Sequence, residues 1–181
     1  LEKINSMQYS PDGKRMVLSA VNRGKTDLYL YQVIGNNFEQ LTRDFWDDSD
    51  PSFIEGGQRI IFTSNRVDDT LRAGADEWMR LRPEHDVYVF DLENRSKLLE
   101  RITNTSQVNE SLPFEYSDKY YSFLADDNGY RNRSIAYVDS VISAIDTSIH
   151  YRYFTVTKKV SEFQRDVHDF EFRSKDGSCF E

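Results

Sequence analysis

Short runs in which apolar and polar side chains alternate recur along the chain, each bounded by residues typical of turns. In the run 27–33, Leu28 and Leu30 alternate with Tyr29 and Tyr31, which places the two pairs on opposite faces of a strand. Runs of similar length and composition follow elsewhere, at 16–20, 38–42, 59–64 and 86–92. Because alternation with a period of two is the signature of half-buried strands, the pattern predicts an all-β chain.

The alternating runs belong to a repeated unit of turn, strand, loop and strand. Residues 9–31 begin with Tyr-Ser-Pro-Asp-Gly-Lys-Arg and end with Asp-Leu-Tyr-Leu-Tyr. Residues 53–90 begin with Phe-Ile-Glu-Gly-Gly-Gln-Arg and end with Asp-Val-Tyr-Val-Phe. An apolar residue and a threonine follow each copy, as Leu41-Thr42 and Ile102-Thr103. A strand-forming unit repeated along a chain indicates a repeat architecture.

Four-stranded units of about 40–50 residues are typical of β-propeller blades. The sequence divides into one blade at 4–42, a second at 47–103 with an insertion at 67–85, a third at 109–157, and the start of a fourth at 165–181. In the third blade, 139–150 is expected to be a long connection between strands. Because propellers close with about 4–8 blades, about three blades and a fraction predict an incomplete propeller. The remaining blades would come from a longer parent chain or from self-association, and an ordinary antiparallel sandwich is the alternative fold.

Composition and charge narrow the range of functions. The net charge is −8, without a basic stripe, so nucleic acid is not an expected partner. No apolar stretch approaches the roughly 18 residues of a membrane span. Cys179 is the single cysteine and cannot form an internal disulfide.

Catalytic and metal-binding patterns are not evident. The three histidines, at 85, 150 and 168, have no second ligand at helical spacing, and no Gly-x-Ser-x-Gly elbow occurs. The cluster Asp47, Asp48 and Asp50 lacks the glycine and distal glutamate of an EF-hand loop. We therefore expect no catalytic residue, no metal and no cofactor in this segment.

The candidate binding residues are those that a propeller would gather at one mouth. Loops that join strand four to the next blade, and strand two to strand three, emerge on the same face. Six residues from these loops are predicted to line that face, namely Trp46, Asp47, Asp48, Arg66, Trp78 and Glu110. The carboxylates could bind a cation of a partner, and an exposed tryptophan could anchor it. In the alternative interpretation, Asp50-Pro51 and neighbouring residues tie the first turn of a blade by hydrogen bonds to the backbone.

Five phrases resemble the TolB-type propeller repeat, and they lie at 10–15, 47–53, 63–66, 86–92 and 101–103. The resemblance covers roughly 4–140. The insertion 67–85 and the degenerate third turn depart from the repeat. The tail at 139–156 looks like large TolB-like proteins of the Bacteroidota.

The resemblance implies a periplasmic or outer-membrane-associated protein, because this family includes periplasmic assembly proteins that bind a peptidoglycan-associated lipoprotein. The leading hypothesis is thus a non-catalytic, protein-binding scaffold segment of a larger bacterial envelope protein, with an envelope lipoprotein or peptide as partner. Similar repeats also form the substrate-gating propeller of prolyl-oligopeptidase-like and tricorn-like serine peptidases, which is the alternative. A third relative, the propeller of oligogalacturonate lyase, would need a histidine-rich metal centre. Fold alone does not decide among these functions.

Overall fold

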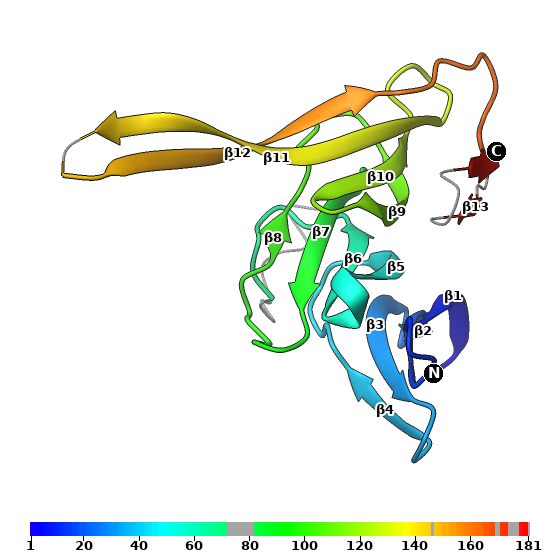
Figure 1. The fold of residues 1–181 in the computed structure, drawn as a ribbon. Coiled ribbons are helices and arrows are strands. Elements are labelled where there is room, and N and C mark those ends of the chain that lie inside the picture. Colours follow the sequence, from blue (N-terminus) through cyan, green and yellow to red (C-terminus); the bar gives the residue numbers. More distant parts are fainter. Residues whose placement is uncertain (72–81, 146, 169–170, 174–177, 181) are drawn as a thin grey trace.

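The computed structural model describes residues 1–71, 82–145, 147–168, 171–173 and 178–180. These residues form three four-stranded antiparallel sheets and a two-stranded pair (Figure 1). The first sheet contains β1 (Lys3–Tyr9), β2 (Arg15–Asn22), β3 (Lys25–Gln32) and β4 (Asn37–Gln40), paired in chain order. The all-β class and the four-stranded blades predicted from the sequence are therefore confirmed.

The second and third sheets repeat this order. The second contains β5 (Asp48–Ile54), β6 (Arg59–Ser64), β7 (Asp86–Asp91) and β8 (Glu100–Arg101), with the short 3-10 turn η1 (Glu55–Gly57) between β5 and β6. The third contains β9 (Glu110–Ser117), β10 (Tyr120–Ala125), β11 (Asn132–Ile145) and β12 (Ile149–Lys159). Near the end of the chain, β13 (Glu171–Arg173) pairs with β14 (Ser178–Phe180).

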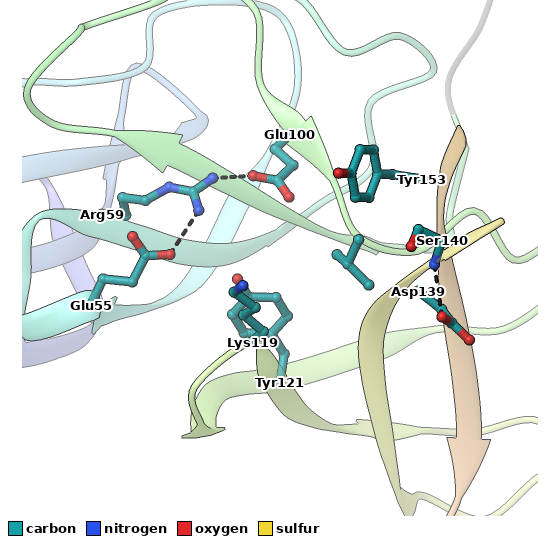
Figure 2. Close-up of a pocket in the computed structure, with 9 residues that line it drawn as sticks. Glu55, Arg59, Glu100, Lys119, Tyr121, Asp139, Ser140 and Tyr153 are labelled. Carbon is teal, nitrogen blue, oxygen red and sulfur yellow. Dashed lines mark hydrogen bonds and ion pairs between the residues drawn. The ribbon is translucent and has the colours of Figure 1, made fainter. Parts of the chain in front are cut away.

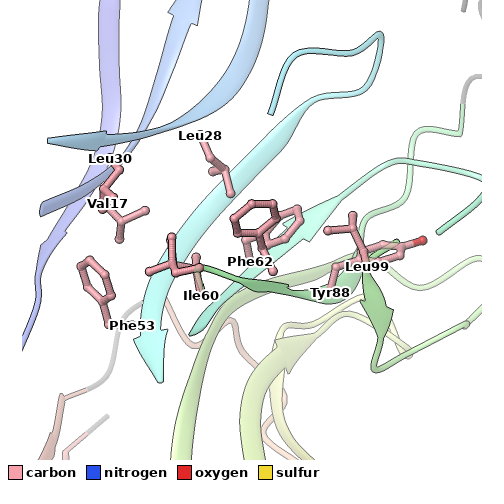
Figure 3. Packing of buried hydrophobic residues seen from close by; sticks show 10 residues of the cluster. Val17, Leu28, Leu30, Phe53, Ile60, Phe62, Tyr88 and Leu99 are labelled. Atoms are coloured by element: carbon pink, nitrogen blue, oxygen red, sulfur yellow. The ribbon is translucent and has the colours of Figure 1, made fainter. Parts of the chain in front are cut away.

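The sheets stack face to face because each inner strand is apolar on both faces. In β3, Leu28 and Leu30 pack toward the second sheet, whereas Tyr29 belongs to a separate cluster on the opposite face. The cluster between the first two sheets is shown in Figure 3, where Leu28 and Leu30 approach Phe53 and Phe62. The opposite faces predicted for the leucines and Tyr29 are therefore confirmed.

A second cluster joins the second and third sheets. Val87 and Val89 of β7 share it with Phe123 of β10 and Ala136 of β11. The second sheet thus contributes Phe62 and its neighbours to one cluster and Val87 and its neighbours to the other. Burial on both sides stabilises this sheet, since each buried large apolar side chain contributes about 1.5–3 kcal/mol.

The repeated threonine has the same structural role in both copies. Thr42 Oγ1 accepts a hydrogen bond of 2.9 Å from the backbone N–H of Leu28, and Thr103 Oγ1 accepts one of 2.7 Å from that of Val87. Both donors lie one residue after the aspartate near the start of the third strand. The threonine therefore satisfies a buried donor that the short outer strand leaves unpaired.

Replacing Thr42 with valine should destabilise the chain by about 1–3 kcal/mol, because it leaves the buried Leu28 N–H without an acceptor. Urea unfolding followed by fluorescence measures the change. Thr26→Val is the matched control, since Thr26 is only half-buried at the start of β3. Equal stabilities of the two variants would contradict the assigned role.

The third sheet corrects one expectation. The segment 139–150 was expected to be a connection, but β11 continues to Ile145 and β12 begins at Ile149, so most of it is a hairpin. In Figure 1 this hairpin, coloured yellow to orange, projects far beyond the rest of the sheet. The segment contains the β-branched residues Val138, Val141 and Ile142, which are common in strands, but its apolar and polar residues do not alternate strictly, so the pattern did not reveal the long strand.

Candidate functional site

Arg66 lies at the centre of a buried ion network beside the first two sheets. Its Nη2 donates to both carboxylate oxygens of Asp48, at 2.7 and 2.9 Å, and its Nη1 donates to Asp44 Oδ2 at 3.1 Å. Its Nε donates to Ser64 Oγ at 2.9 Å. The guanidinium also lies 5.7 Å from the centre of the Tyr88 ring. Arg66 therefore joins the end of β6 to the loop that enters β5.

Charge pairing opposes the effect of burial on Arg66 and Asp44. Burial by itself lowers the pKa of Arg66, but the carboxylates of Asp48 and Asp44 outweigh it and hold that pKa above its ordinary value. Burial raises the pKa of Asp44 to about 6, although Arg66 opposes the rise. Breaking such a network by removing one partner is costly, because the remaining charges stay buried.

The loop between β4 and β5 is held by its own polar residues. The Asp47 N–H donates to Asn65 Oδ1 at 2.9 Å, and Asp47 Oδ1 accepts from the Thr26 N–H at 3.0 Å. The Trp46 N–H donates to Asp44 Oδ1 at 3.0 Å, and the Trp46 ring lies edge-on to Phe45. These contacts hold the loop against the ends of β3 and β6.

Glu110 occupies the position in β9 that Asp48 occupies in β5. Its Oε1 accepts from Thr105 Oγ1 at 2.9 Å, and its Oε2 accepts from Thr103 Oγ1. Burial raises the pKa of Glu110 to about 7, although both hydroxyls oppose the rise. Glu110 is therefore held by the hydroxyl groups of Thr103 and Thr105. Asp48, at the equivalent position in the second sheet, is held by Arg66.

The six candidate residues differ in how far they are buried. Trp46, Asp48, Arg66 and Glu110 are buried, and Asp47 is half-buried. Trp78 lies outside the described residues. The expectation that Trp46 is exposed is wrong, because none of its surface is accessible. Burial supports the alternative interpretation, in which these residues tie the start of each blade, and contact with a partner stays a prediction for the six residues.

A pocket on the predicted mouth face lies beside this network, and we name it the mouth pocket. Its volume is about 350 Å³, and it is lined by Asn22, Arg23, Lys25, Asp27, Gln40, Arg43 and Asp44. Arg23 and Arg43 are exposed at its rim, whereas Asp27 is 5% exposed. Asp27 Oδ2 accepts from Gln40 Nε2 at 2.9 Å. The pocket therefore has long cationic side chains at its rim, above a buried carboxyl group.

Among the residues that the structure describes, Asp27 in the first sheet lacks the arginine partners of the equivalent aspartate in the second sheet. Asp86 occupies the same place in β7, where Arg101 Nη2 lies 2.5 Å and Arg82 Nη1 3.0 Å from its Oδ2. In the first sheet, Gln40 takes the place of Arg101, since the two residues pair with equivalent tyrosines. Desolvation therefore raises the pKa of Asp27 to about 7, and Asp48 and Asp44 add to the rise. Asp27 was not among the predicted site residues, although both copies of the repeat carry an aspartate at this position, Asp27 and Asp86.

We expect the stability of the chain to fall between about pH 5 and pH 8 because of Asp27. Its pKa is raised in the folded state, so folding binds a proton in this window, and the stability present at low pH is lost as the pH rises. The loss should be about 1–2 kcal/mol, less than the full shift implies. In urea unfolding at pH 5 and pH 8, Asp27→Asn should make this fall smaller, and the raised pKa values of Glu110 and Asp44 account for the fall that remains. A pH dependence equal to that of the unchanged chain would contradict the assignment.

A second pocket lies between the second and third sheets, as Figure 2 shows. Its volume is about 420 Å³, and it is lined by Glu55, Arg59, Glu100, Lys119, Tyr121, Val138, Asp139, Ser140 and Tyr153. Arg59 Nη1 donates to Glu55 Oε1 at 2.8 Å, and its Nη2 donates to Glu100. The projecting hairpin contributes Tyr153 on the other side of the pocket.

Within the described part of the chain, no group of three or more histidine, cysteine, aspartate or glutamate side chains is arranged to hold a metal ion. None of its helices has the length and apolar character needed to cross a membrane.

Four-stranded antiparallel sheets stacked face to face define a β-propeller fold. Two solved structures show which propellers it resembles: TolB from Acinetobacter baumannii matches with a TM-score of 0.52 and 16% identity, over 91% of this chain and 45% of that chain. Putative TolB from Agrobacterium tumefaciens matches with a TM-score of 0.55 and 13% identity, over 86% of this chain and 64% of that chain. The fold is thus TolB-like, as the sequence predicted, and the chain spans 45% and 64% of these two structures. No protein-family model matches the sequence, and neither does any curated protein.

Proposed function

We propose that the chain is a non-catalytic, protein-binding propeller segment of a larger bacterial cell-envelope protein, periplasmic or associated with the outer membrane. The likeness to TolB structures supports the envelope setting. The proposed partner is a polypeptide, either an envelope lipoprotein or a peptide, and the proposed contact surface is the mouth pocket with Asp47 beside it.

The observation that supports this proposal is the mouth pocket, which is lined by basic and acidic side chains and has one wall held in place by buried contacts. The buried network of Arg66, Asp48 and Asp44 holds the loop that forms one wall. Arg23 and Arg43 at the rim can pair with carboxylates of a partner, and backbone groups of the loops can accept or donate further hydrogen bonds. Loops that a rigid sheet positions are common binding surfaces.

Site-specific photocrosslinking in the cells that make the full protein tests the proposal. A benzophenone side chain introduced at Arg43 should crosslink to one discrete polypeptide that carries an envelope export signal. Glu93 is the matched control, because it is exposed in the turn after β7, at the end of the second sheet away from the mouth. Equal crosslinking at both positions, or none at Arg43, would show that the mouth is not the binding surface.

A further inference from the structure

The outer edge of the third sheet differs from the outer edges of the other two. The outermost strands β4 and β8 contain 4 and 2 residues, whereas β12 contains 11. Natural proteins keep edge strands short or interrupt them, because an open edge presents backbone donors and acceptors to any other strand. β12 contains no proline and is the edge strand along its whole length. It is therefore a long template for strand addition.

Part of this sheet extends beyond its neighbouring strands. The ladder between β10 and β11 ends at Tyr137, whereas β11 and β12 continue to pair as far as Ile145 and Ile149. We call the two-stranded part, 138–145 with 149–155, the hairpin arm. Isolated two-stranded hairpins are marginally stable in water, and a third strand or a packed face stabilises them.

One face of the hairpin arm continues an interface that is already formed. Ala136 is buried between the second and third sheets, and Val138 and Tyr153 farther along line the pocket in Figure 2. Beyond the pocket the same face carries Ile142 opposite Tyr151, and these side chains are 54% and 51% exposed. Tyr153 itself is 69% exposed. The apolar stripe therefore runs from a packed core onto an open surface.

The charge of β12 is opposite to that of the chain. The strand carries Arg152, Lys158 and Lys159 and no acidic residue, whereas the chain has a net charge of −8. Arg152 and Lys158 are six residues apart and point to the same face of the strand, because side chains alternate with a period of two. Tyr151 and Tyr153 point to the other face.

We propose that the outer edge of β12 binds an extended acidic segment of a partner polypeptide, which pairs with it as an added strand. The backbone of the segment would complete the open ladder, as in other strand-addition complexes. Its carboxylates would lie beside Arg152 and Lys158, and its apolar side chains would cover Tyr151 and Tyr153. Cross-strand neighbours of opposite charge and paired apolar residues both stabilise such a sheet. The segment therefore alternates acidic and apolar residues.

This inference shares with the proposed function only the premise that the chain binds another polypeptide. The mouth pocket lies on the first sheet and the hairpin arm on the third. Charge reversal on the arm should leave crosslinking at Arg43 unchanged, so failure at one site is distinguishable from failure at the other.

A labelled, capped ten-residue peptide of alternating glutamate and valine is the probe, and fluorescence anisotropy with the full chain is the measurement. We expect saturable binding, and hydrogen exchange should slow at amides of β12. The double variant Arg152→Glu/Lys158→Glu should weaken binding at least about tenfold and should bind the matching lysine–valine peptide instead. Because that variant must gain a ligand, a misfolded arm cannot imitate the expected result.

Two further comparisons separate strand pairing from simple apolar contact. The glutamate–valine peptide with every amide N-methylated should not bind, because neither of its edges can then donate hydrogen bonds to the ladder. Tyr151→Thr/Tyr153→Thr should weaken binding about tenfold, whereas Phe38→Thr on the short outer strand β4 should leave it unchanged.

Four results would overturn the proposal. These are equal binding of the N-methylated peptide, binding unaffected by charge reversal, binding of phosphatidylglycerol vesicles in preference to the peptide, and self-association through the arm that excludes the peptide.

Discussion

Replacing Arg66 with alanine is expected to lower the free energy of unfolding by about 3–5 kcal/mol, the cost of removing one partner from a buried charge network. The side chains of Arg66, Asp48 and Asp44 are fully buried. Without the guanidinium, two carboxylates would remain close together in a region of low polarity, and one of them would have to take up a proton. Urea unfolding at neutral pH measures the loss.

Two variants test the reason for this loss. Arg95→Ala removes a surface ion pair with Glu39, whose N–O distance is 2.7 Å and whose side chains are 40% and 51% exposed. That change should cost at most about 1 kcal/mol. Arg66→Met combined with Asp44→Asn and Asp48→Asn should be more stable than Arg66→Ala, because it leaves no charge unpaired. A triple variant no more stable than Arg66→Ala would show that unpaired buried charge does not cause the loss.

Replacing Trp46 with alanine is expected to destabilise the chain by about 3–5 kcal/mol, because the ring is fully buried and its removal leaves a large cavity. Trp46→Phe keeps part of the volume and should cost less. Phe38→Ala is the surface control, since Phe38 is 54% exposed. Urea unfolding distinguishes these variants.

The same variant also separates the two roles considered for Trp46. A stabilising side chain predicts a large change in unfolding free energy for Trp46→Ala. A contact residue predicts normal stability together with lost crosslinking at Arg43. The second result would restore Trp46 as the anchor proposed from the sequence.

Local patterns predicted the blades correctly where the backbone itself carries the information. The alternation at 27–33 predicted opposite faces for Leu28 and Tyr29, because side chains alternate along any strand. The threonine after each copy was visible as a repeat, but its acceptor role for Leu28 was not, since that bond joins residues 14 apart. Asp27 was overlooked for a similar reason, because its difference from Asp86 depends on Gln40 across the strand pair.

The mouth stays a prediction as a binding surface, whereas the exposure expected for Trp46 was wrong. The rule for propeller loops placed Asp48 and Arg66 on one face, and these two side chains do lie in contact. A sequence records charge and spacing, but it does not record which charged residues the adjoining sheets cover. The hairpin arm shows the same limit, because the mixed apolar and polar residues at 138–142 are compatible with either a short strand and a loop or one long strand.

The inner strands, the turns and the repetition of a blade follow from the sequence alone, because periodicity and turn residues act over only a few neighbouring positions. The burial of Arg66 and Trp46 and the long outer edge of β12 follow from the three-dimensional arrangement of the sheets. Burial and charge pairing depend on contacts between sheets, such as the 2.7 Å bond from Arg15 Nη2 to the carbonyl oxygen of Gly57, 42 residues away. Such contacts exist only after the sheets have stacked.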